Sequence, residues 1–241
     1  MIDRFSEDIE LTLDLCHFSR SKARLANKAV VSICDNIGFK IVNRERVAHN
    51  SHAAYNCYYI EYPIQHASAA IKPYVQVEMV FMHKAYPSEL KRANSLIREW
   101  LIDHESKGIK EYELEPFPVI VQTLDRTFVD KVFAICDYYL RKEPFRNSRH
   151  IYDLSRIINK INFDDSLRPL ILEVYRDRLP SSRCPSAKEG IVISKILNEI
   201  VDTHYFESDY NSVTKLLLTK NVDYDEAIKT LSLISNSGLF D

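Results

Sequence analysis

The sequence predicts a mixed α+β fold followed by an entirely helical part. Before residue 125, segments with alternating polarity and segments rich in tyrosine, valine and isoleucine are typical of strands. After residue 125 the apolar residues recur with helical period, and Pro144, Pro180 and Pro185 interrupt them. We therefore expect two domains, a mixed one over residues 1–124 and a helical one over residues 125–241.

The first expected elements are a strand and a helix. Residues 7–15 alternate acidic with aliphatic side chains, which is the period of a strand with one polar face. A helix is then expected from Ser19 to Asp35, with Ser19 as its N-cap and with Leu25, Ala29 and Ile33 on its apolar face.

The middle of the chain predicts further strands and a helix. Tyr55–Ile64 and Tyr74–Met82 have strand composition, and the pattern turns helical from Pro87 through Leu90 and Leu101. Residues 117–121 predict a short apolar strand. The helices expected after it cover residues 126–142, 148–161, 165–179, 187–205, 209–220 and 223–236.

Composition excludes several classes of site. The net charge of −2 means that any nucleic acid must be met by a local basic patch. The chain has four glycines, the first at Gly38, so it holds no Rossmann fingerprint and no Walker loop. Five cysteines without C-x-x-C spacing argue against a disulfide framework or zinc knuckle and favour the cytoplasm. No apolar run approaches the length of a membrane span.

Three carboxylates on expected strands form a candidate metal site. Asp8 and Glu10 are two residues apart, so both leave the same face of their strand, and Glu78 interrupts one face of Tyr74–Met82. Three acidic oxygen donors on neighbouring strands suit Mg²⁺, which takes substrate phosphates as further ligands. A solvated strand edge is the alternative interpretation of the acid pair.

The helical part adds two candidate positions. Lys131 lies beside an apolar stripe, where it either extends to solvent or presents its ammonium to a phosphate. Arg149 and Asp153 stand at i, i+4, the spacing of a helical ion pair worth only a few tenths of a kcal/mol (about 0.3).

Four segments together resemble one family. Residues 4–11 (RFSEDIEL), 77–79 (VEM), 126–131 (RTFVDK) and 149–154 (RHIYDL) resemble, in order, the motifs of the AbiEii/AbiGii-type nucleotidyltransferase toxins, which include the MenT toxins. Asp209 and Tyr210, with the aliphatic segment after them, resemble the C-terminal part of that family. The resemblance spans nearly the whole chain.

The resemblance implies a polymerase-β-like nucleotidyltransferase domain, a helical domain and an active site between them. Members are toxins of bacterial toxin–antitoxin and abortive-infection systems, commonly paired with a winged-helix antitoxin, and characterised ones add nucleotides from NTPs to the tRNA 3′ end. Asp8 and Glu10 would then bind Mg²⁺ with Glu78 as third ligand, and Lys131 and Arg149 would bind the nucleotide phosphates. Asp153 would orient the nucleophile or assist Lys131.

One family motif has no counterpart in these residues. A Gly-Gly-Thr-Ser-Leu-like turn precedes the acid pair in the family and holds the triphosphate, whereas only seven residues precede Asp8 here. We therefore expect an N-terminally truncated nucleotidyltransferase domain. The alternative is a non-catalytic remnant that serves as an antitoxin- or RNA-binding helical module.

Two basic clusters are candidates for an RNA path. For the first, a solvated helix face is the favoured interpretation, and the second surrounds the RHIYDL motif. The first comprises Arg20, Lys22, Arg24 and Lys28, and the second comprises Arg141, Lys142, Arg146, Arg149, Arg156 and Lys160.

Overall fold

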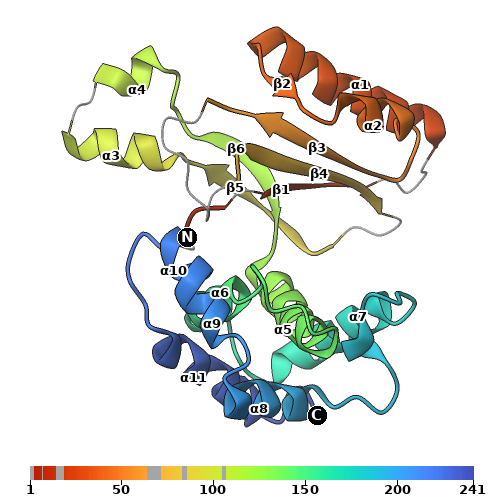
Figure 1. The fold of residues 1–241 in the computed structure, drawn as a ribbon, viewed down its shortest axis with the longest axis vertical. Coiled ribbons are helices and arrows are strands. Elements are labelled where there is room, and N and C mark those ends of the chain that lie inside the picture. The colour runs from red at the N-terminus through yellow and green to blue at the C-terminus, as the bar shows by residue number, and fades with distance from the viewer. Residues whose placement is uncertain (1–2, 7, 15–18, 64–71, 83–85, 105–106) are drawn as a thin grey trace.

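The computed structural model describes residues 3–6, 8–14, 19–63, 72–82, 86–104 and 107–241. These residues form a half that contains the sheets, up to residue 122, and a helical half from residue 124 onward (Figure 1). The mixed α+β class expected from the sequence is confirmed. Residues 7, 15 and 64, at the ends of expected strands, lie outside the described residues.

A four-stranded sheet organises the first half. It consists of β1 (Asp8–Asp14), β4 (Tyr74–Met82), β3 (Tyr55–Glu61) and β2 (Lys40–Ile41), in that spatial order. β1 pairs parallel to β4, and the other neighbours are antiparallel. The strands expected at 7–15, 55–64 and 74–82 are thus confirmed, and β1 is an edge strand.

The two faces of this sheet have different neighbours. One face buries Val77, Met79 and Phe81 beneath α1 (Arg20–Ile37), and α2 (Arg44–His49) lies on the same side (Figure 1). The alternation along β1 and β4 places Asp8, Glu10 and Glu78 on the other face. That face is directed toward the helical half (Figure 1).

The buried face of α1 differs from the expected one. Ser19 caps the helix as predicted, since its hydroxyl accepts a hydrogen bond from the Lys22 N–H at 3.2 Å. Leu25 and Ile33, however, are 70% and 59% exposed, and Ala29 is exposed too. The helix instead buries Ala23, Asn27 and Cys34. Small and polar side chains there meet the sheet closely, and the Tyr58 hydroxyl donates to the side-chain Oδ1 of Asn27, so hydrophobicity alone predicted the wrong face.

A second correction concerns the segment after Pro87. It forms a strand, β5 (Ser88–Ala93), and the helix α3 begins only at Leu96 and runs to His104. Leu90 lies opposite Ile120 of β6 (Phe117–Gln122), so pairing with a distant strand determines its conformation. β6 confirms the strand expected at residues 117–121, and the short α4 (Lys107–Glu111) precedes it.

The helical half surrounds a single core. Each of the helices expected after residue 125 has a counterpart, although the segment expected at 209–220 is divided by a π-helical turn over Tyr210–Thr214. Short 3₁₀ turns cover Ile158–Lys160, Asp165–Leu167 and Pro185–Ala187. The helices are α5 (Leu124–Leu140), α6 (Arg149–Ile157), α7 (Arg168–Arg178), α8 (Ile193–Thr203), α9 (Glu207–Asp209), α10 (Lys215–Leu217) and α11 (Tyr224–Ser235).

Its core gathers side chains from distant helices. Phe128 and Val132 of α5, Tyr152 of α6 and Leu231 of α11 are all buried in it. Burial of this kind contributes about 1.5–3 kcal/mol for each large apolar side chain. None of the described helices is long and apolar enough to cross a membrane.

The N-terminal segment connects the two halves. The Phe5 N–H donates to the Leu217 carbonyl at 2.8 Å, and the Thr219 N–H donates to the Asp3 carbonyl at 3.1 Å. Arg4 forms an isolated antiparallel bridge with Leu218 between them. The residues that enter β1 are therefore held against the helical half near α10 (Figure 1).

Candidate active site

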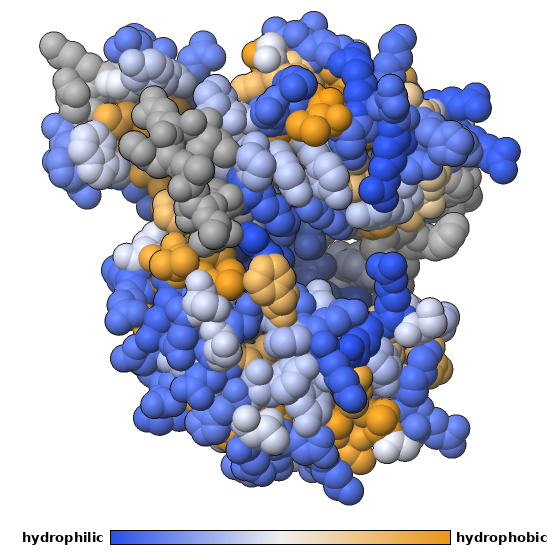
Figure 2. Space-filling model, viewed as in Figure 1, coloured by the Kyte–Doolittle hydropathy of each residue, from blue (hydrophilic) through white to orange (hydrophobic). Residues whose placement is uncertain are grey.

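The candidate site lies where the acidic face of β1 meets α5 and α6. Figure 2 shows the surface hollowed between the two halves, with hydrophilic residues above and below the hollow and apolar ones at one side of it. The Asp8 side chain is 15% exposed, and its Oδ2 accepts a hydrogen bond from Arg149 Nη2 at 3.1 Å. Lys72 Nζ lies 3.5 Å from Asp8 Oδ1. One cation from the helical half and one from the sheet half thus balance the Asp8 carboxylate.

The other two carboxylates lie next to Asp8 on the sheet. Glu10 stands directly opposite Glu78 in the parallel register, and Glu10 is exposed. Gln76, which stands opposite Asp8, donates from its amide to a Glu78 carboxylate oxygen. The structure therefore places all three predicted acids on neighbouring positions of one face.

The donor set of this face fits a hard cation. Among the described residues, no three acidic, histidine or cysteine side chains are already close enough together to hold a metal ion. The three predicted ligands nevertheless all offer carboxylate oxygens, which Mg²⁺ prefers. Asp8 Oδ1 is buried and makes no hydrogen bond within the described chain, and its ion-pair partner is Lys72 Nζ at 3.5 Å, so a metal ion at this oxygen would take the place of the Lys72 ammonium.

Asp153 of α6 is the centre of a second charged cluster. Its Oδ1 accepts from Arg4 Nε at 2.6 Å, and its Oδ2 accepts from Arg4 Nη2 at 2.8 Å and from Lys131 Nζ at 2.7 Å. The Asp153 side chain is fully buried. Burial alone raises the pKa of this carboxyl, but the hydrogen bonds and charges of Arg4 and Lys131 outweigh burial and hold the pKa well below its usual range. Asp153 is therefore an ionised, fully bonded carboxylate.

The two clusters connect α6 with the N-terminal segment in a crossed pattern. Arg149 and Asp153 have the spacing of a helical ion pair, but Arg149 pairs with Asp8, and Asp153 pairs with Arg4 and Lys131. The ion pair considered from their i, i+4 spacing is therefore wrong. Both residues of α6 thus have a partner near the N-terminus, Asp8 for Arg149 and Arg4 for Asp153.

His150 is a site neighbour that sequence reasoning missed. Both of its ring nitrogens are buried without a hydrogen-bond partner in the described chain, and the ring stacks on Tyr138 at a centroid distance of 5.4 Å. Burial, together with the nearby Lys131 charge, lowers the pKa of His150 well below its ordinary value. The imidazole is thus neutral beside a cluster that carries the positive charges.

Asp209 fixes the loop that leads into α6. Its two carboxylate oxygens accept hydrogen bonds from the Arg146 N–H at 2.7 Å, the Ser148 N–H at 3.1 Å and the Ser148 hydroxyl at 2.6 Å. The Ser148 hydroxyl also lies 2.7 Å from the Thr214 hydroxyl. This buried network holds the start of α6, the helix that carries Arg149 and Asp153.

Substituting Asp209 tests that network. We expect Asp209→Asn to lower the free energy of unfolding by about 2–3 kcal/mol, because an amide supplies one acceptor oxygen where two were used and directs N–H groups at N–H donors. Chemical denaturation measures the change, and Asp202→Asn at an exposed position of α8 is the matched control. Equal stability of the two variants would contradict the assigned role.

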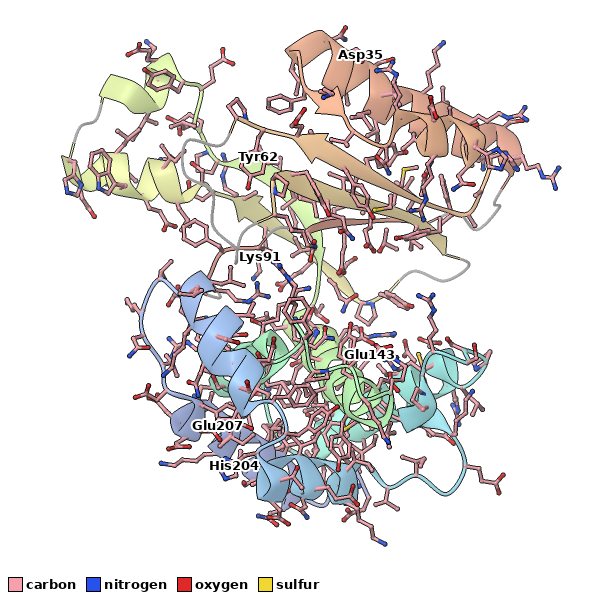
Figure 3. All side chains as sticks on the ribbon, viewed as in Figure 1. Asp35, Tyr62, Lys91, Glu143, His204 and Glu207 are labelled. Carbon is pink, nitrogen blue, oxygen red and sulfur yellow. The ribbon has the colours of Figure 1, made fainter. Side chains whose placement is uncertain are left out.

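A separate groove has no acidic cluster. It has a volume of about 540 Å³, and its lining includes Phe39, Tyr62 and Pro73 and the ion pair of Lys40 with Glu61. Tyr62 is labelled in Figure 3 in the sheet half. None of Asp8, Glu10 and Glu78 lines it, and the carboxylate in its lining, Glu61, is the one paired with Lys40.

Comparison with known proteins identifies one family. A sequence model described as "Nucleotidyl transferase AbiEii toxin, Type IV TA system" matches residues 1–229. No curated protein and no solved structure matches the chain. The matched range covers the sheet half, the helical half as far as α11, and all the site residues described above.

Proposed function

Since the chain belongs to the AbiEii nucleotidyltransferase toxin family of type IV toxin–antitoxin systems, we propose that it transfers a nucleotide from an NTP to RNA in an Mg²⁺-dependent reaction. Nucleotidyltransferase activity follows from the family, and the metal, the donor and the acceptor are the proposed parts. The observation that carries the proposal is that α6 pairs with Asp8 of β1 through Arg149 and, one helical turn later, pairs with Lys131 through Asp153.

Asp8, Glu10 and Glu78 would hold the metal. All three project from one face of β1 and β4, and Asp8 keeps one buried oxygen without a hydrogen bond in the described chain. Bound there, Mg²⁺ would offset the charge of the triphosphate and stabilise the attacking and leaving oxygens. These oxygen ligands are the reason for proposing Mg²⁺ rather than a softer metal.

The helical half would bind the triphosphate and orient the acceptor. Lys131 is 18% exposed and Arg149 is 23% exposed, so both cations are partly accessible to a ligand although most of each side chain is packed. When a triphosphate binds, Arg149 exchanges part of its interaction with Asp8 for the phosphates. Asp153 keeps Lys131 in place, which fixes the ammonium where charge develops on the leaving pyrophosphate.

The proposed acceptor is the 3′ end of tRNA or of another RNA. Arg141, Lys142 and Arg146 lie in the loop between α5 and α6, immediately before Arg149, and Glu143 of that loop is labelled in Figure 3. The other basic cluster lies on exposed positions of α1, on the face of the sheet opposite the acids. The loop is therefore the better candidate for an RNA path. We further propose a winged-helix antitoxin as partner and the cytoplasm as location.

Phe145 in this loop provides a test of RNA contact. Its side chain is 69% exposed, and Lys142 and Arg146 of the same loop have φ angles of 59° and 62°, a costly conformation for residues other than glycine. We expect Phe145→Ala to raise KM for the RNA acceptor about tenfold through lost base stacking, with KM for NTP unchanged. Steady-state kinetics measures both constants. Leu233→Ala, at an exposed position of α11, is the control, and an equal effect of the two substitutions would contradict stacking on Phe145.

RNA labelling tests the function itself. Purified protein is incubated with Mg²⁺, total cellular RNA and each α-labelled NTP in turn, and label in RNA is measured after gel separation. We expect one or more NTPs to label RNA of tRNA size, and omission of Mg²⁺ to abolish labelling. Absence of labelling with every NTP, together with retained RNA or antitoxin binding, would contradict the proposal and favour the non-catalytic binding module.

A further inference from the structure

We propose that Arg4 is a positioning residue for the nucleotide site: its pairing with Asp153 leaves the Lys131 ammonium as a net positive charge for the triphosphate. This inference rests on the proposed function, since it concerns how the same site binds an NTP. Arg4 is not among the residues for which the sequence predicted a catalytic role, which are Asp8, Glu10, Lys131 and Asp153.

The guanidinium of Arg4 makes a bidentate contact with the carboxylate of Asp153. Nε and Nη2 donate to separate oxygens of Asp153 at 2.6 and 2.8 Å, and Nη1 donates to the Phe5 carbonyl at 2.9 Å. The side chain is 10% exposed. Its backbone is held as well, because the flanking Asp3 and Phe5 bond to Thr219 and Leu217. Because both its backbone and its guanidinium are held by hydrogen bonds, Arg4 has one orientation relative to Asp153.

The pairing of Arg4 with Asp153 changes the net charge of the cluster around Asp153. Arg4 and Lys131 carry two positive charges against the single negative charge of Asp153, so the cluster has a net charge of +1. Without Arg4, Lys131 and Asp153 would form a neutral pair and would attract a triphosphate much less. Because Asp153 is fully buried whereas Lys131 is 18% exposed, the surplus charge is presented on the side from which a ligand can approach.

Arg4 also sets the position of the acids relative to Lys131. It precedes Asp8 by one short stretch of chain and is anchored to α6, while Asp8 is anchored to α6 through Arg149 at 3.1 Å. The two anchors are one helical turn apart, at Asp153 and Arg149. The strand that would hold the metal and the lysine that would hold the phosphates are thus joined by the Arg4–Asp153 contact.

Nucleotide binding by a set of charge variants tests this inference. Isothermal titration calorimetry with ATP, GTP, CTP and UTP, each with Mg²⁺, first identifies the NTPs that the full chain binds. We expect Arg4→Gln to weaken binding of those NTPs by about 10- to 100-fold, since one unit of charge is lost near the phosphates. Arg4→Lys keeps the charge without the bidentate contact, and we expect it to bind better than Arg4→Gln.

A double variant separates the charge effect from damage to the fold. Arg4→Gln combined with Asp153→Asn restores the net charge of +1, so we expect it to bind NTP more tightly than Arg4→Gln alone. A purely structural role for Arg4 predicts no such rescue. Arg168→Gln is the control, because Arg168 of the helical half pairs with Asp165 at 2.7 Å and belongs to neither basic cluster. We expect its NTP affinity to equal that of the unaltered protein.

The failures of the inference and of the proposed function are distinguishable. If the unaltered protein binds NTP and Arg4→Gln binds it equally well, the role of Arg4 is overturned while the proposed function stands. Weak binding by the double variant, no better than that of Arg4→Gln, would also overturn it. If the unaltered protein binds none of the four NTPs, the proposed function fails and the inference fails with it.

Discussion

Asp8→Asn is expected to reduce nucleotide transfer to RNA by about 10³-fold or more. The substitution removes an anionic oxygen donor from the proposed metal site, and loss of a group that stabilises developing charge in a preorganised site has effects of this size. It also leaves Arg149, which donates to Asp8 Oδ2 at 3.1 Å, beside a neutral amide. Incorporation of labelled NTP into RNA measures the rate.

The control for Asp8 is an acid on the same sheet that lies outside the site. Glu61 of β3 pairs with Lys40 at 3.0 Å, and its side chain is half exposed, so Glu61→Gln should leave the transfer rate and the fold unchanged. Circular dichroism of both variants establishes that they are folded. Full activity of a folded Asp8→Asn variant would remove Asp8 from the proposed chemistry.

Arg126→Met has the largest expected effect on stability. The Arg126 side chain is 1% exposed, and it donates to Asp130 at 3.0 Å, to Asp177 at 3.0 Å and to Glu173 at 3.2 Å. Its guanidinium also lies 3.8 Å from the ring centroid of Tyr86, a residue of the sheet half. Methionine fills much of the volume but leaves three carboxylates close together without their shared cation.

We expect this substitution to lower the free energy of unfolding by about 3 kcal/mol or more, because removing one member of a buried charge network leaves its partners uncompensated. Urea denaturation measures the change. Arg44→Met is the matched control, since Arg44 lies even closer to its partner Asp35, at 2.6 Å, but is 54% exposed. We expect the control to change stability by less than about 1 kcal/mol. Equal losses for both variants would contradict a special role for the buried network.

Local patterns predicted the parts of the fold that are determined locally. The alternation of acids and aliphatics predicted β1, and strand composition predicted β4 with the bounds observed. Ser19 predicted the start of α1 because an N-cap acts within one turn. Two predictions were wrong because they depend on distant partners. The buried face of α1 is set by the polar contact of Asn27 with Tyr58, and the segment around Leu90 forms a strand and no helix because β5 pairs with β6.

The candidate site, too, has a part that local spacing predicted and a part that depends on contacts between distant residues. The period of two placed Asp8 and Glu10 on one face, and the register of β1 with β4 brings Glu78 directly opposite Glu10. The pairing of Arg4 with Asp153 joins residues 149 positions apart, and no spacing rule indicates such a contact. Sequence patterns therefore identified the residue types of the site, whereas the charge balance around Lys131 emerged only from the three-dimensional arrangement.

The most direct test of the central claim is a crystal structure of the protein with Mg²⁺ and a non-hydrolysable NTP analogue. The proposed function predicts the metal at Asp8, Glu10 and Glu78, with the triphosphate beside Lys131 and Arg149. A nucleotide bound instead in the groove lined by Phe39 and Tyr62, with its phosphates away from Asp8 and Lys131, would contradict that claim.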